Sequence, residues 1–166
     1  MKNSTLSARV DSTAIKSECG LYRYELKRVW DSERETGVFL CANPSTADHL
    51  LSDQTVLNCS NLAVQWNWGG FYVVNLYPTI STDPEKMKHD SKAEEWNTKF
   101  VKDAFAKVQK IVLACGNGHG PCLDELIKDI PTERLFCLRK NKGGGFLHPA
   151  RIKVEDFPQP IRAFDQ

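Results

Sequence analysis

Four short apolar runs, each closed by turn-forming residues, constrain the fold of this chain most strongly. They cover residues 37–42, 71–77, 111–115 and 135–138. Runs of this length are typical of strands that are buried on both faces, as in a parallel sheet. Between them lie segments whose apolar residues have helical spacing, at 53–65, 94–109 and 122–130. This alternation predicts an α/β protein: a three-layer α/β/α sandwich around a four-stranded, mostly parallel central sheet.

The N-terminal part of the chain has a different pattern. Residues 21–30 alternate apolar and polar side chains and include aromatic ones, which predicts a strand at the edge of the sheet. Residues 1–20 show no periodicity, so we expect a loose N-terminal segment followed by a single domain over residues 21–166. The length of 166 residues fits one domain, since a domain typically holds roughly 100–200 residues.

Composition and charge argue against several classes of protein. The formal net charge is +1, so no global field marks a nucleic-acid partner, although residues 134–162 are locally basic. No apolar run approaches the ~18 residues of a membrane span, and the polar first residues lack a secretory signal. None of the six cysteines forms a C-x-x-C pair, which argues against a zinc site or a disulfide scaffold. We therefore expect a cytoplasmic protein with reduced thiols, no metal, no cofactor and no membrane contact; the oligomeric state stays open.

Polar residues follow the predicted strands at their carboxyl ends, which is where open parallel α/β sheets bind ligands. This rule selects four segments, at 43–46, 75–79, 116–119 and 147–149. Asn75 offers a donor and an acceptor side by side, which suits the edge of a nucleobase. His148 can donate a hydrogen bond to a developing negative charge or position water. Either side chain can instead be a turn former that is satisfied by the backbone.

Each of the other candidate residues also has a structural explanation that involves no ligand. Asp48 and Asp53 are the carboxylates nearest the first polar segment, so either can orient water as a base or cap a helix. Trp68 precedes two glycines and can stack on a base or belong to the core. Three basic side chains can hold phosphates or form a solvated face: Lys140, Lys142 and Arg151.

Several of these motifs resemble a family of small bacterial and phage proteins described only as a domain of unknown function. The resemblance covers roughly residues 21–155. Its motifs are Tyr22-Arg23-Tyr24, the turn from Asn43 to Asp48, Asn75-Leu76 and His148-Pro149. The order of the motifs is also similar, more remotely, to that of the uracil-DNA glycosylase superfamily. This second resemblance implies a sandwich fold of the uracil-DNA glycosylase type.

The glycosylase resemblance also implies a role for each motif. Asn43 takes the place of the turn residue that holds the catalytic water, with Asp48 beside it as a further catalytic candidate. Asn75 takes the place of the asparagine that reads the base, and His148 that of the histidine that stabilises the departing base. Further contacts to the base or substrate are expected from Pro44, Ser45, Trp68, Tyr77 and Gly116.

These observations leave three hypotheses for function. The first is an enzyme that hydrolyses the N-glycosidic bond to a damaged or modified base, in DNA or in a nucleotide. Asn43 stands where the fastest glycosylases carry Asp, and an amide cannot act as a base. The second hypothesis is therefore a module that binds a nucleotide, a modified base or nucleic acid without chemistry. The third is an accessory protein, of phage or host, that acts through protein contacts alone.

Overall fold

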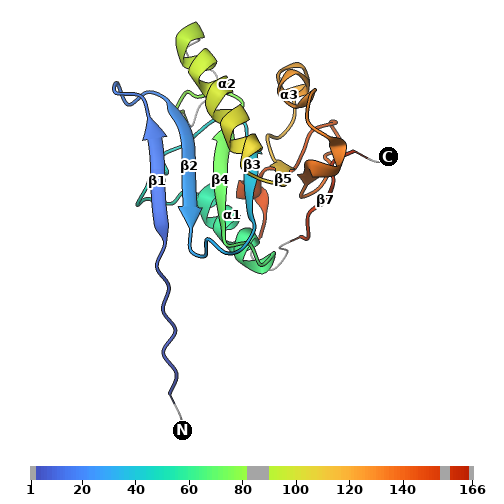
Figure 1. Cartoon of the computed structure of the whole chain (residues 1–166). Helices are drawn as coiled ribbons and strands as arrows, with labels where there is room; N and C mark the ends of the chain where they lie inside the picture. Colours follow the sequence, from blue (N-terminus) through green and yellow to red (C-terminus); the bar gives the residue numbers. More distant parts are fainter. Residues whose placement is uncertain (1–2, 82–89, 154–157, 165–166) are drawn as a thin grey trace.

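Seven strands form one mixed sheet within residues 3–81, 90–153 and 158–164, the parts of the chain that the computed structural model describes (Figure 1). Their bounds are β1 Asp11–Lys16, β2 Arg23–Val29, β3 Thr36–Cys41, β4 Gly70–Asn75, β5 Lys110–Leu113, β6 Leu135–Cys137 and β7 Ile161–Arg162. The order across the sheet is β1-β2-β4-β3-β5-β6-β7. The pairs β4–β3, β3–β5 and β5–β6 are parallel, whereas the outer pairs are antiparallel.

The α/β class is confirmed, but the sheet is larger and more mixed than the four strands predicted. The prediction that residues 21–30 form an edge strand is wrong, because β2 pairs with β1 on one side and with β4 on the other. β1 lies inside the segment that we expected to be loose. Its six residues are mostly exposed and mostly polar, so pairing with β2, rather than an apolar pattern, makes them a strand. Residues 3–10, before β1, run away from the sheet (Figure 1).

Three α-helices join the strands in the described ranges: α1 Gln54–Gln65, α2 Ser91–Ala106 and α3 Gly120–Ile127. Each falls on a segment with predicted helical spacing. Asp53 caps α1, one of its two predicted roles, because its carboxylate accepts a hydrogen bond from the Val56 backbone N–H at 2.8 Å. A short 3₁₀ turn, Pro149–Arg151, follows His148. None of the described helices is both long and apolar enough to cross a bilayer.

The helices cover both faces of the sheet, which gives the molecule three layers. Along β3, Val38 and Leu40 belong to a core shared with α2 and α3, while Phe39 and Cys41 belong to a second core shared with α1. This division follows from the alternation of side chains along a strand. We call the two sides the α2/α3 face and the α1 face. Figure 1 shows α2 crossing in front of the sheet.

Candidate functional site

The polar segments selected from the sequence lie at one edge of the sheet. The strand registers pair Cys41 with Asn75 and Leu113 with Cys137, at the ends of adjacent parallel strands. The segment that holds His148 joins them, because the backbone N–H of Leu147 donates to a carbonyl just beyond β6 at 2.9 Å. All four segments therefore follow the carboxyl edge, the location where α/β sheets bind ligands.

The candidate side chains divide between the two faces of the sheet. Asn75 lies two residues after Val73, which belongs to the α1-face core, and beside Cys41 of the same core. Tyr77 is turned toward α3, since its ring centroid lies 5.6 Å from that of His119. Gly116 and His119 line a cavity of about 290 Å³ on that side. The side chain of Asn75 therefore lies on the α1 face and that of Tyr77 on the α2/α3 face, at the same edge of the sheet.

The carboxamide of Asn75 is the clearest anomaly at this edge. The residue is 1% exposed, and neither its side-chain nitrogen nor its oxygen has a hydrogen-bond partner. Its backbone is well held, because Asn97 Nδ2 donates to the carbonyls of Asn75 and Leu76 at 2.9 and 3.1 Å. Asn97 Oδ1 is left without a partner too. Buried polar side chains are rarely unpaired in native proteins, so the Asn75 amide is a candidate contact for a ligand.

Asn58 on α1 shows what a satisfied amide looks like in this protein. Its Nδ2 donates to the carbonyls of Pro149 and Ile152 at 2.7 and 3.1 Å, and its Oδ1 accepts from Gln54 Nε2 at 2.9 Å. These bonds tie the first turns of α1 to the segment that follows His148. Asn58 was not selected from the sequence, because an amide inside a helix carries no positional signal of its own.

His148 lies at the same end of the α1 face. Its Nδ1 accepts from the Ala150 backbone N–H at 3.3 Å, which assigns the ring proton to Nε2. Burial lowers the pKa of His148 below its ordinary value; the Asp53 charge opposes this effect, and Arg151 adds to it. The ring is therefore neutral at pH 7, with an Nε2–H that can donate to a ligand.

A second buried polar group, Arg23, was missed in the sequence. The register of β1 with β2 pairs Ile15 with Glu25 but Lys16 with Arg23, so Tyr24 forms a β-bulge. The bulge turns Arg23 toward the α1 face, where its Nη1 donates to the Ala47 carbonyl at 2.8 Å. The residue is 2% exposed, and its Nε has no partner. An alternating strand gives no sign of a bulge, and so gave no reason to place this guanidinium inside.

Asn43 and the turn after it are hydrogen-bonded to the neighbouring segment at Ser81. Asn43 Nδ2 donates to the Ser81 carbonyl at 2.6 Å, and the Ser81 backbone N–H donates to the Pro44 carbonyl at 3.1 Å. The turn is thus fastened to the segment after β4. Asn43 and Ser45 are both half-buried, and Pro44 is buried. The carbonyl oxygen of the Asn43 amide is the part of this side chain left to face water or a ligand.

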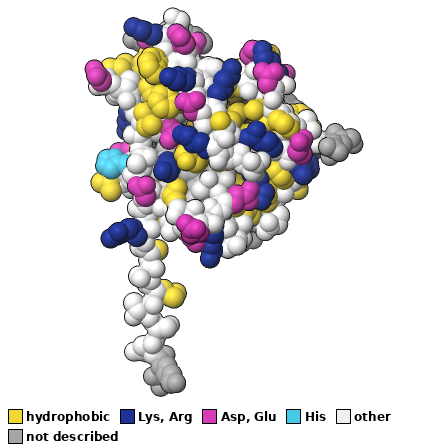
Figure 2. Space-filling view, in the orientation of Figure 1, with side chains coloured by type: hydrophobic (Ala, Val, Ile, Leu, Met, Phe, Trp, Pro, Cys, Tyr) yellow, Lys and Arg dark blue, Asp and Glu magenta, His cyan; other side chains and the backbone are white. Residues whose placement is uncertain are grey.

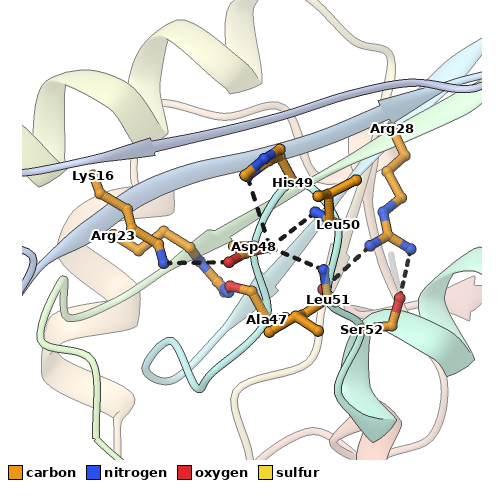
Figure 3. Close-up of polar contacts among 9 residues, drawn as sticks. All are labelled: Lys16, Arg23, Arg28, Ala47, Asp48, His49, Leu50, Leu51 and Ser52. Atoms are coloured by element: carbon orange, nitrogen blue, oxygen red, sulfur yellow. Dashed lines mark hydrogen bonds and ion pairs between the residues drawn. The ribbon is translucent and has the colours of Figure 1, made fainter.

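The carboxylate of Asp48 is hydrogen-bonded to the backbone of its own loop. Its Oδ1 accepts from the backbone N–H groups of Leu50 and Leu51 at 2.8 and 2.9 Å, and its Oδ2 lies 4.0 Å from Lys16 Nζ (Figure 3). The two backbone hydrogen bonds hold the pKa of Asp48 below its ordinary value. The prediction that Asp48 caps a helix is wrong, because its carboxylate bonds the backbone of its own loop and Asp53 is the cap of α1; the role of general base stays a prediction.

Trp68 lies far from the carboxyl edge. It precedes β4 and is 2% exposed, and its ring packs against Phe39 and Trp66 at centroid distances of 5.7 and 5.0 Å. The same ring fills the space over Gly37, whose absent Cβ would lie 2.2 Å from it. Trp68 is therefore a core residue, and the alternative role of stacking on a base at this site is wrong.

The three predicted phosphate-binding residues do not line one common site. Lys140 pairs with Phe146 across a hairpin, and Lys142 is exposed near its tip. Arg151 instead lines a cavity of about 240 Å³ beside α1-face residues, together with Arg139 and Lys153. The structure thus gathers a different basic set from the one predicted, because the hairpin carries the two lysines away from Arg151.

Taken together, the fold and this edge define a three-layer α/β protein with an unsatisfied, buried amide, that of Asn75, at the carboxyl end of β4. The chain belongs to the family described as Protein of unknown function (DUF1643), which it matches over residues 23–150. That match confirms the resemblance to a domain of unknown function. No curated protein and no solved structure matches the chain.

Proposed function

We propose that this protein binds a nucleobase at the α1 side of the carboxyl edge, with Asn75 reading the base. The single observation that carries the proposal is the Asn75 carboxamide, buried with both polar atoms unpaired. A base edge presents a donor and an acceptor side by side, the complement of an amide. Binding such a base would satisfy both atoms at once.

The first candidate reaction is hydrolysis of the N-glycosidic bond to that base. Water, hydrogen-bonded to the Asn43 amide oxygen, would attack C1′ of the sugar while the bond from C1′ to the base nitrogen breaks. The electron pair leaves with the base, whose carbonyl oxygen gains negative charge, and the base takes up the proton that the water loses. A neutral His148 donating from Nε2 would stabilise that oxygen. These roles are assigned from the resemblance of the motif order to that of the uracil-DNA glycosylases.

The second candidate is binding without chemistry. Two observations favour it: Asn43 is an amide rather than a carboxylate, and Asp48 is engaged by two backbone N–H groups. Asp53 is likewise engaged as the cap of α1. A site without an available base binds a nucleotide more readily than it activates water.

Thermal shift against free bases, nucleosides and nucleotides tests the binding, and chromatography of released base tests the reaction. We expect one class of compound to stabilise the wild type and to lose its effect in Asn75→Leu. Asn67→Gly is the matched control, since Asn67 lies before β4 at the opposite edge and its positive φ of 59° suits glycine. Released base that depends on His148 would support hydrolysis. Stabilisation by none of the compounds would contradict the proposal.

A further inference from the structure

A buried guanidinium without an anion lies on β2, the strand next to β4, which ends at Asn75. Arg23 is 2% exposed, and its hydrogen bond to the Ala47 carbonyl leaves Nε unpaired. Among the described residues, no carboxylate forms an ion pair with it within 4.0 Å. The acidic charges that act on it most, Asp53 and Asp48, are bonded to backbone N–H groups of their own segments. An unpaired buried charge is costly.

The β-bulge explains how this charge comes to be inside. In a regular strand, Arg23 would share the face of Glu25, which the charges of Lys107 and Asp103 place on the side of α2. The bulge at Tyr24 sends that ring to α2, where it stacks on Phe100 at 5.3 Å, and sends Arg23 to the opposite face. Bulges commonly re-aim a side chain next to a functional site.

Arg23 and Asn75 lie at the same edge of the sheet. β4 lies between β2 and β3, and Asn75 pairs with Cys41 of β3, while the backbone N–H of Arg23, the first residue of β2, donates to the Pro78 carbonyl just after β4. The charge of Arg23 reaches the Cys41 thiol, since each group shifts the pKa of the other. Arg23 Nη1 donates to the carbonyl of Ala47, which belongs to the same α1-face core as Cys41, the partner of Asn75, so both polar groups lie on the α1 side of the sheet.

We propose that Arg23 binds the oxyanion of a small ligand, a phosphate or a carboxylate, whose base is read by Asn75. The identity of the base rests on the function proposed above; the anion does not. A guanidinium this deeply buried cannot reach the backbone phosphates of a strand that stays at the surface. Figure 2 shows the α2/α3 face, on which Lys and Arg alternate with Asp and Glu, so that face offers no single-sign track for a polymer. The ligand is therefore a free anionic molecule such as a nucleoside monophosphate, rather than nucleic acid.

The test measures the affinities of uridine, uridine 5′-monophosphate and a short oligonucleotide, alongside melting temperatures in phosphate, acetate or chloride at equal ionic strength. We expect the monophosphate to bind about ten- to a hundredfold more tightly than the nucleoside, the range for hydrogen bonds to charged groups. Arg23→Gln should abolish that ratio and Arg23→Lys should reduce it. Arg28→Gln is the matched control, because Arg28 lies on the same strand but bonds an exposed Ser52 hydroxyl at 2.8 Å.

The outcomes separate this inference from the proposed function. If nucleoside binding depends on Asn75 but a phosphate on the nucleoside does not raise the affinity, the anion-binding role of Arg23 is refuted and base recognition is supported. Arg23-dependent stabilisation by phosphate or acetate, without nucleoside binding, would support the anion site and contradict base recognition; the more effective ion identifies the oxyanion. If Arg23→Gln does not fold, the wild type decides, because equal melting temperatures in all three salts and with the nucleotide overturn the inference. Tighter binding of the oligonucleotide than of the monophosphate overturns it as well.

Discussion

Replacing Asn75 by leucine should stabilise the ligand-free protein. The carboxamide has both polar atoms buried below 1 Å² of exposed surface and without a partner. Leucine has a similar shape and no polar atoms to desolvate. The substitution removes a cost and offers the α1-face core an apolar side chain beside Cys41 and Val73.

The expected gain follows from the number of unpaired groups. A buried unsatisfied donor or acceptor costs about 1–3 kcal/mol, and Asn75 contributes one of each. Leucine is slightly bulkier than asparagine, and overpacking takes back about 1–3 kcal/mol. With the middle of each range, about 4 kcal/mol is gained from the two groups and about 2 kcal/mol is lost to overpacking, so the net expectation is about 2 kcal/mol of added stability. For a chain of this size that corresponds to a rise in melting temperature of roughly 2–4 °C per kcal/mol.

Asn58→Leu is the matched comparison, since both asparagines are buried at the same end of the fold. Asn58 makes three side-chain hydrogen bonds, and its loss leaves the Pro149 and Ile152 carbonyls unpaired. We expect it to destabilise the protein by about 2–4 kcal/mol. Urea unfolding without nucleotides, followed by circular dichroism and tryptophan fluorescence, gives both free energies. If Asn75→Leu destabilises the protein by more than 1 kcal/mol, the amide is satisfied internally and the argument for a ligand fails.

Two further predictions concern the segments around the site. Gly145→Ala should lower stability by about 2–3 kcal/mol, because its Cβ would lie 2.0 Å from the Gly116 carbonyl oxygen. Gly120→Ala, which has open space at its Cβ, should change stability by no more than about 0.5 kcal/mol. Thermal unfolding compares the two variants directly, and equal melting temperatures would refute the close packing at Gly145. His148 should make stability fall with acid: its folded pKa lies below its unfolded one, so the unfolded chain takes up the proton first and stability is lost as pH drops from about 6.5 toward the folded pKa. Melting temperatures between pH 7.5 and 5.5 should therefore fall less steeply in His148→Gln than in the wild type, and parallel curves would contradict the assignment.

The strands and helices that the sequence predicted are those with an apolar pattern of their own. β3, β4, β5 and β6 are buried on both faces, so their composition alone separates them from the helices. Asp53 was a candidate cap because it precedes a helical pattern, but the sequence alone left open whether its carboxylate caps the helix or acts as a base. β1 was missed, because a half-exposed outer strand needs no apolar residues and its identity depends on a partner strand.

The candidate site was predictable in position but not in detail, for a similar reason. Asn75 ends β4 as predicted, whereas His148 ends no strand and lies in a loop before a 3₁₀ turn; the Leu147 hydrogen bond still brings this loop to the edge at which β4 ends. Whether an amide is paired depends on residues far along the chain: Asn97 takes the Asn75 carbonyl, and nothing takes its side chain. Arg23 depends on a one-residue bulge, which has no pattern in a short strand.

The way in which the backbone around Asn75 is held indicates that the unpaired amide serves a ligand and is not a packing defect. Asn97 fixes the backbone carbonyls of Asn75 and Leu76, so the end of β4 is held rigidly while the side chain stays unpaired. A rigid support with open polar atoms loses little entropy when a ligand binds. Arg23 repeats the arrangement, since one bond to the Ala47 carbonyl anchors the guanidinium and its Nε stays open. Two anchored, unsatisfied groups on neighbouring strands, one amide and one cation, together describe the complement of a single ligand with an amide-like edge and a negative charge.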